Sequence, residues 1–258
     1  MILFDSHSHL QDPHCIARID AILARAGAAG VTRVLCCGTG PSDWHAVATL
    51  AAAYPAILPA FGLHPWFIGE RTPDWLEKLE ALLGAFSLAT VGEIGLDHAT
   101  EDRNDADQAA VFIAQLKLAR KFGRPVSIHC RKAWGDMMKI LSEQCGLPCG
   151  GAIHSYSGPV DLIKQLAAMN VSLSFSGSIV YDRNLRGRAA AALVDAGRLL
   201  IETDSPDLCP PGVAPGENEP ANVVAVAGIL AEIRGCTPEA IAECSTRNAA
   251  RIFVLQGS

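Results

Sequence analysis

Short apolar segments alternate with longer amphipathic segments along the 258-residue chain. The apolar segments have the length of buried strands. They fall at residues 2–5, 31–37, 56–62, 87–93, 125–130, 150–155, 171–176 and 198–203. The segments between them carry apolar residues at helical spacing, and within 15–27 the side chains of Ile16, Ile19, Ile22 and Leu23 follow it. The pattern is therefore that of eight strands, each followed by helical sequence.

Eight such units predict an α/β fold, a (β/α)8 TIM barrel that forms a single domain over residues 1–258. A doubly wound open sheet is the rival fold, but its glycine-rich phosphate loop is missing. No linker or internal repeat interrupts the pattern. Residues 207–220, rich in proline and glycine, are expected to form a long loop over the carboxyl end of the barrel.

The charge balance narrows the range of partners. Acidic residues outnumber basic ones 27 to 21, which gives a net charge of −6. This argues against a broad basic surface for duplex nucleic acid. A small phosphate substrate remains compatible, because bound metal supplies positive charge locally. Residues 46–63 are uncharged, but Pro55 and Pro59 interrupt them, so we predict a helix, a turn and a strand there and no membrane span.

The nine cysteines are odd in number, scattered, and without paired C-x-x-C spacing. No charged and apolar leader precedes the first strand. We therefore expect reduced thiols that pack as small apolar side chains, and a cytoplasmic protein.

Polar side chains stand where six of the predicted strands end. Barrel enzymes build their sites at this edge. The residues are His7, His9, His64, Glu93, His129, His154 and Asp204, and they include five of the eight histidines of the chain. Because His7 and His9 are two positions apart on one strand, both rings project to the same side and can share one ion.

Strand alternation predicts which residues lie next to this set on the interior face of the barrel. If His129 faces the barrel interior, Ser127 does too, and likewise Ala152 with His154 and Val91 with Glu93. Small side chains there would leave room for ions. So many polar groups near a core need partners, and we predict a metal site. Its residues are His7, His9, Glu93, His129, His154 and Asp204. The mixed imidazole and carboxylate set suits an open site for Zn²⁺, Mn²⁺ or Mg²⁺, and the sequence does not choose among them.

These motifs resemble the TatD family of metal-dependent hydrolases, within the amidohydrolase-like barrels. The resemblance covers nearly the whole chain. It rests on "DSHSHL", "GLHP", "VGEIGLD", "PVSIHCR", "HSYSG", "ETDSP", "NEPAN" and "NAARIF". Two places depart from the family pattern: "HSHLQD", where members often show H-x-H-L-D, and His98 after "GLD", where an aromatic residue is common. Neither departure removes a ligand position.

The resemblance implies a site with two divalent cations. Glu93 would bridge them, with His7, His9 and Asp204 completing one ion and His129 and His154 the other. It also implies that Asp204 acts as a general base, so that Asp204 and Glu93 are the catalytic residues.

Further roles are implied around this site. His64 and Arg131 are expected to bind the scissile phosphate, and Asp5 to orient a ligand. The remaining polar residues are expected to be structural or solvent-facing. They are Lys132, Arg183, Arg186 and Arg188, interpreted as a solvated helix face, His14 and His45 with no assigned role, and Glu202 and Asn248 in structural roles.

The implied function is a metal-dependent deoxyribonuclease, a hydrolase of ester bonds that trims single-stranded DNA or 3′ ends as a 3′–5′ exonuclease. One alternative is a hydrolase of another bond, such as a D-aminoacyl-tRNA deacylase, because the same ion pair can attack an ester or amide carbonyl. A second alternative is a non-catalytic subunit that binds nucleic acid or a partner, with structural metals. A monomer is expected, and membership of a larger complex stays open.

Overall fold

The structure, a computed structural model, describes residues 1–100 and 103–254. Eight parallel strands form one sheet in chain order. They are β1 (Leu3–Ser8), β2 (Val31–Cys37), β3 (Ile57–Phe61), β4 (Thr90–Asp97), β5 (Val126–Arg131), β6 (Gly151–Ile153), β7 (Val171–Phe175) and β8 (Leu199–Ile201). The last strand returns to the first, where the Asp204 N–H donates to the His7 carbonyl at 3.0 Å and the Ser6 hydroxyl donates to the Ile201 carbonyl at 2.9 Å. The predicted (β/α)8 barrel is confirmed.

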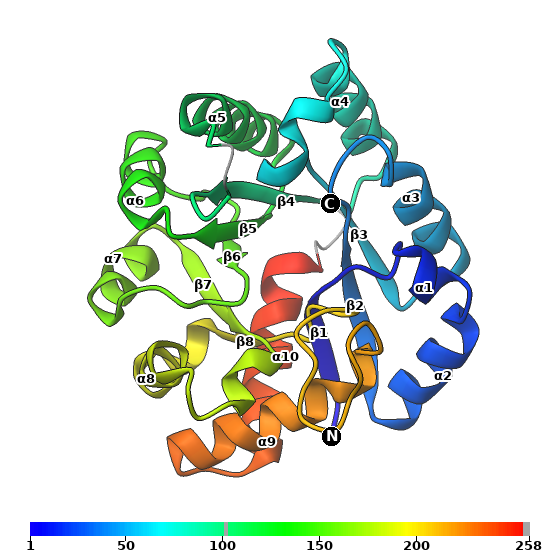
Figure 1. The fold of residues 1–258 in the computed structure, drawn as a ribbon, viewed down its shortest axis with the longest axis vertical. Helices are drawn as coiled ribbons and strands as arrows, with labels where there is room; N and C mark the ends of the chain where they lie inside the picture. The colour runs from blue at the N-terminus through cyan, green and yellow to red at the C-terminus, as the bar shows by residue number, and fades with distance from the viewer. Residues whose placement is uncertain (101–102, 255–258) are drawn as a thin grey trace.

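Helices surround the sheet as a ring (Figure 1). The α-helices are α1 (Pro13–Ile16), α2 (Ile19–Ala28), α3 (Trp44–Ala53), α4 (Trp75–Ala85), α5 (Asp105–Phe122), α6 (Trp134–Glu143), α7 (Ile163–Ala168), α8 (Leu185–Leu193), α9 (Val223–Arg234) and α10 (Pro238–Phe253). Short 3₁₀ turns are η1 (Pro65–Glu70), η2 (Val160–Leu162), η3 (Gly177–Val180), η4 (Ala196–Arg198) and η5 (Pro220–Asn222). None of the described helices has the length and apolar character needed to cross a membrane.

Two apolar cores hold these layers together. The larger core lies between the sheet and the outer helices. The smaller core fills the amino-terminal end of the barrel interior. Its members are Phe4, Leu35, Cys37, Ala60, Ala152 and Leu200 from the strands, with Ala249, Ile252 and Phe253 from α10. Helix α10 thus closes this end, and the Asn248 side chain fixes it by donating to the carbonyls of Ala196 and Leu199, which is the structural role expected for Asn248.

Strand β4 differs from its prediction. It begins at Thr90 and runs on to Asp97, so Glu93 lies within the strand and does not end it. The register shifts between Val91 and Ile94, and Val91 consequently belongs to the core between sheet and helices. The expectation that Val91 shares the interior face of Glu93 is therefore wrong.

Two glycines in β4 lie where β5 approaches closely. They are Gly92 and Gly95. A Cβ on Gly92 would lie 2.8 Å from the Ser127 Cβ, and one on Gly95 would lie 2.0 Å from the His129 carbonyl oxygen. The glycines thus extend the strand pairing instead of ending it.

The expected loop at 207–220 has no helix or strand before Pro220, where the 3₁₀ turn η5 begins. Its base lies against the carboxyl end of the barrel, because Asp207 lines the cavity there. The Asn218 amide secures the loop by donating to the carbonyls of Thr203 and Asp207, at 2.9 and 2.6 Å.

Candidate metal centre

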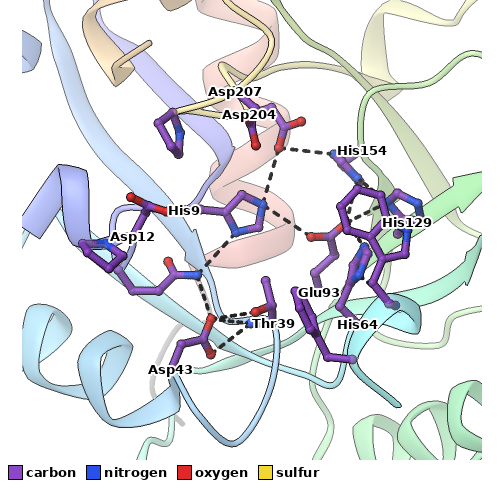
Figure 2. Close-up of a pocket in the computed structure, with 15 residues that line it drawn as sticks. His9, Asp12, Thr39, Asp43, His64, Glu93, His129, His154, Asp204 and Asp207 are labelled. Atoms are coloured by element: carbon purple, nitrogen blue, oxygen red, sulfur yellow. Dashed lines mark hydrogen bonds and ion pairs between the residues drawn. The ribbon is translucent and has the colours of Figure 1, made fainter. Parts of the chain in front are cut away.

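A cavity of about 320 Å³ opens at the carboxyl end of the barrel (Figure 2). Its wall comes from strands β4 and β5 and from the segments that follow β1, β2, β3, β6 and β8. The lining residues are His9, Gln11, Asp12, Pro13, Thr39, Asp43, His64, Trp66, Phe67, Glu93, His129, His154, Asp204, Pro206 and Asp207. Among the described residues, no lysine or arginine lines it. An anion would therefore meet a surface of carboxylates, imidazoles and aromatic rings.

Glu93 lies at the centre of this cavity, and its two carboxylate oxygens face different groups of imidazoles (Figure 2). Oε2 lies 3.4 Å from Nε2 of His7 and 3.5 Å from Nε2 of His9. Oε1 lies 3.0 Å from Nδ1 of His129 and 2.8 Å from Nε2 of His154. One carboxylate thus joins the two halves of the cluster.

Asp204 completes the half that contains His7 and His9. Its Oδ1 lies 3.5 Å from Nε2 of His9 and 3.7 Å from Nε2 of His7. The residue adopts φ +56°, in the left-handed region, where aspartate is tolerated better than most residues. This backbone conformation places the carboxylate over the barrel mouth, three residues beyond the end of β8.

Asp5 supports that backbone. It is fully buried, and it accepts hydrogen bonds from the Thr203 N–H at 2.8 Å and the Thr203 hydroxyl at 2.5 Å. The His7 N–H donates to it as well, at 3.4 Å. Asp5 was expected to orient a ligand. In the structure it accepts hydrogen bonds from the main chain at His7 and Thr203, next to Asp204, and not from an imidazole ring. Burial raises the pKa of its carboxyl to about 8.

Each of the four imidazoles around Glu93 described so far has one ring nitrogen that contacts a neighbouring group outside the cluster. His9 donates from Nδ1 to the Cys37 carbonyl at 2.7 Å. The other three imidazoles meet side chains: His7 Nδ1 lies 3.0 Å from Ser127 Oγ, His129 Nε2 lies 3.1 Å from Asp97 Oδ2, and His154 Nδ1 lies 3.4 Å from Glu202 Oε1. Such partners orient imidazoles that bind metals and fix their tautomers.

Sequence reasoning missed the role of Asp97, although the residue stands in the motif "VGEIGLD". Its signal is the alternation that continues beyond Gly95, outside the predicted strand at 87–93. Ser127 was anticipated only as a small residue below His129, and its contact is with His7 from another strand. Glu202 accepts from the Ser155 N–H at 2.7 Å, so its structural role includes supporting the segment that carries His154.

His64 belongs to the cluster and lines the cavity. Its Nδ1 accepts from the Trp66 N–H at 3.2 Å, and its Nε2 lies 3.4 Å from Glu93 Oε1. Burial lowers the pKa of His64 to about 4, so the ring is neutral at pH 7 with its proton on Nε2. Burial by itself would raise the pKa of Glu93, but the surrounding imidazoles, led by His64 and His154, hold that pKa well below its usual range.

The other candidates lie away from the cavity wall. Arg131 ends β5 with an exposed side chain and does not line the cavity, and Lys132 beside it is exposed as well. Arg183 stacks over Tyr181 at 4.9 Å. His14 and His45 are exposed on helices α1 and α3.

The arrangement fits divalent cations. Three groups have ligand atoms that all lie within 4.8 Å of one another: His7, His9 and Asp204; His7, Glu93 and His154; and His64, Glu93 and His129. All six residues predicted to bind metal occur in these groups, and His64 joins them. Buried imidazoles and carboxylates at this density need a positive partner, and oxygen and nitrogen donors of this kind suit Zn²⁺, Mn²⁺ or Mg²⁺.

Known proteins share both the sequence and the fold. Residues 4–254 match the family described as TatD related DNase. The chain is 31% identical over 252 residues to the "uncharacterized metal-dependent hydrolase YabD" of Bacillus subtilis, which covers 98% of this chain and 99% of that protein. It is 30% identical over 244 residues to the "3'-5' ssDNA/RNA exonuclease TatD" of Cronobacter sakazakii, with 93% of both chains covered.

A solved structure agrees with this relationship. The crystal structure of YJJV, a TatD homologue from Escherichia coli, superposes with a TM-score of 0.93 at 29% identity and 98% coverage of both chains. The (β/α)8 barrel, the buried histidine and carboxylate cluster and these relatives agree, and the chain belongs to the TatD family of metal-dependent hydrolases.

Proposed function

We propose that this protein is a deoxyribonuclease that removes nucleotides from single-stranded DNA or 3′ ends in the 3′–5′ direction, with two divalent cations (Mg²⁺, Mn²⁺ or Zn²⁺) in the barrel mouth. The observation that carries the proposal is the position of Glu93, whose two oxygens face separate groups of imidazoles. A carboxylate so placed suits a pair of ions, and paired ions clamp the attacking and leaving oxygens of a phosphoryl displacement. A relative named as a 3′–5′ exonuclease supports the choice of substrate.

The residues assigned to the ions are those of the cluster. His7, His9 and Asp204, which form one of the groups above, would hold one ion. His129 and His154, whose Nδ1 and Nε2 lie 3.1 Å apart, would hold the other, and Glu93 would contribute to both. When bound, the ions would supply Lewis acidity to the phosphate and ease the ionisation of a water molecule. They would also reverse the negative charge of a cavity that has no lysine or arginine in its wall among the described residues.

The protein's own groups would move the proton and hold the substrate. Asp204 is the proposed general base, accepting a water proton on its carboxylate at the cavity mouth. His64, neutral with Nε2–H, is a hydrogen-bond donor for a phosphate oxygen. Arg131 is proposed to contact the phosphate from outside the cavity wall, where its exposed guanidinium matches phosphate geometry.

The chain is proposed to act as a monomer, because one barrel supplies all six residues assigned to the ions and the site needs no residue from a second copy. It is proposed to act in the cytoplasm, because all nine cysteines, which lie within the described residues, are free thiols.

The test is release of nucleotides from end-labelled oligonucleotides with Mg²⁺, Mn²⁺ or Zn²⁺, alongside a charged D-aminoacyl-tRNA. Wild type should shorten the 3′-ended single strand, and Glu93→Ala should not. His45→Ala, an exposed helical histidine, is the control and should behave as wild type. Deacylation of the tRNA without nucleotide release would replace the proposal with the alternative hydrolase. Equal activity of wild type and Glu93→Ala would overturn it.

A further inference from the structure

One aromatic side chain at the cavity mouth is exposed. Trp66 lines the cavity and has 53% of its surface open to solvent. No other tryptophan or phenylalanine in residues 1–100 and 103–254 is as exposed. An exposed tryptophan beside a cluster of ion-binding groups suggests a surface for a ligand.

The indole is held firmly despite its exposure. Its Nε1–H donates to Oδ2 of Asp97 at 2.7 Å. Asp97 is fully buried and is fixed in turn by the Ala99 N–H at 2.7 Å. The ring's orientation is therefore set by a group inside the protein, and ordering it costs a ligand little conformational entropy.

The neighbouring rings meet the indole edge-on. His64 lies 5.0 Å away at 87° and His129 lies 6.1 Å away at 67°, measured between ring centroids and planes. Among the described residues no aromatic ring stacks in parallel on Trp66. Since 53% of the Trp66 surface is also open to solvent, the indole can offer a face to a flat ligand group.

The size and polarity of the cavity restrict that group. A volume of about 320 Å³ is at the small end of ligand pockets. The cavity wall near Trp66 contains carboxylates and imidazoles, which would face a phosphate held by ions. The exposed indole adds a broad apolar surface at the rim. A planar base attached to that phosphate would lie against it.

We propose that Trp66 stacks on the unpaired nucleobase next to the scissile phosphate, so that the site selects a frayed or single-stranded terminal nucleotide. This rests on the proposed function and narrows its substrate. A base paired within a duplex keeps both faces stacked on its neighbours and cannot lie on the indole. Stacking tolerates any base, because each has an aromatic face.

The first experiment measures kcat and KM of wild type, Trp66→Phe and Trp66→Ala on a single-stranded oligonucleotide. Each is measured with a natural and with an abasic 3′-terminal nucleotide. Loss of one stacked base corresponds to roughly 5- to 150-fold. Trp66→Ala should raise KM by such a factor on the natural end, Trp66→Phe less, and neither should change KM on the abasic end.

The second experiment does not depend on turnover. Deoxyadenosine monophosphate is titrated into the metal-loaded protein while tryptophan fluorescence is recorded, with base-free deoxyribose 5-phosphate as the matched ligand. Wild type should show saturable quenching by the nucleotide only, and Trp66→Phe should lose it. Metal content measured on each variant shows whether the bond to Asp97 was needed for ion binding.

The outcomes separate the two proposals. If wild type cleaves oligonucleotides but Trp66→Ala changes KM equally on natural and abasic ends, or not at all, the stacking role is wrong and the nuclease assignment stands. If wild type cleaves no oligonucleotide, the nuclease assignment fails. Quenching that persists in Trp66→Phe, or is absent in wild type, overturns the stacking role in either case.

Discussion

The two ends of the barrel interior are built on the same strands but hold opposite kinds of side chain. Ala152 on β6 belongs to the apolar core, and His154, just beyond the end of that strand, belongs to the cavity. Leu200 on β8 also belongs to the apolar core, and Glu202, just beyond β8, has its Oε1 3.4 Å from Nδ1 of His154. The amino-terminal end is closed by α10, and the carboxyl end is open and polar (Figures 1 and 2).

The difference separates stability from chemistry. Burying apolar groups at the closed end lowers the free energy of the folded state. Burying imidazoles and carboxylates at the open end costs free energy until they find partners. A change at the closed end should therefore act on unfolding, and a change at the open end on metal binding and hydrolysis.

The largest expected effect is a loss of hydrolysis caused by a substitution at the open end. Glu93→Gln keeps the shape of the side chain but removes the charge that two groups of imidazoles face. We expect hydrolysis to fall by about 10³-fold or more, because the site loses its central electrostatic contact. Initial rates and metal content by atomic emission measure this. Glu243→Gln, on an exposed face of α10, is the control, and metal retained in full by Glu93→Gln would contradict the expectation.

The matching change at the closed end is Phe253→Ala. Phe253 is fully buried, 6.3 Å from Phe4 between ring centroids. Removing a buried phenylalanine side chain costs about 3–5 kcal/mol of unfolding free energy, measured by urea denaturation. The rate per folded molecule should be unchanged. Leu185→Ala, at a side chain that is 74% exposed, should be near neutral, and a large loss of metal affinity in Phe253→Ala would break the separation of the two ends.

A smaller effect is expected from Asp97→Asn, which weakens the support of His129 without removing a proposed ligand. Losing such a partner lowers metal affinity by about 10- to 100-fold. Calorimetric titration with the metal ion measures it. Asp161→Asn on exposed η2 is the comparison. An unchanged affinity for the metal ion would show that the Asp97 carboxylate supports only the indole of Trp66.

The smallest expected effect is a change of the unfolding free energy with pH. Burial raises the folded-state pKa of Asp5 to about 8 from 3.8. The folded protein therefore holds a proton that the unfolded chain loses, so this contribution is fully present below pH 3.8 and is lost as pH rises through about 8. Between these values, unfolding free energy should fall by about 1.4 kcal/mol per pH unit from this group. Urea denaturation in the presence of a chelator, from pH 5 to 8, measures this. The unfolding free energy should fall less steeply with pH in Asp5→Asn than in wild type, and equal slopes for the two proteins would refute the expectation.

Local signals predicted the fold and most of the polar side chains that gather around the cavity. Apolar segments at regular intervals were enough for the barrel, because each strand and helix is recognised by its own periodicity. His7, His9, His64, His129, His154 and Asp204 stand next to or within these segments, so their common edge followed from topology. The prediction was weakest at β4, where Gly92 and Gly95 permit a close approach of β5 that no local pattern shows.

By itself, the sequence determined the architecture, the edge of the barrel at which the polar side chains gather and the residue types that meet there. Only the tertiary structure decided which oxygen of Glu93 faces which imidazole. It also decided that Asp97 supports both His129 and Trp66. The hydrogen bond from the Thr203 main chain to Asp5 was likewise decided there. Periodicity encodes the face to which a side chain points, whereas the partner it meets comes from a strand up to 198 positions away in the chain. Such contacts depend on how closely the strands pack, which is decided when the barrel closes.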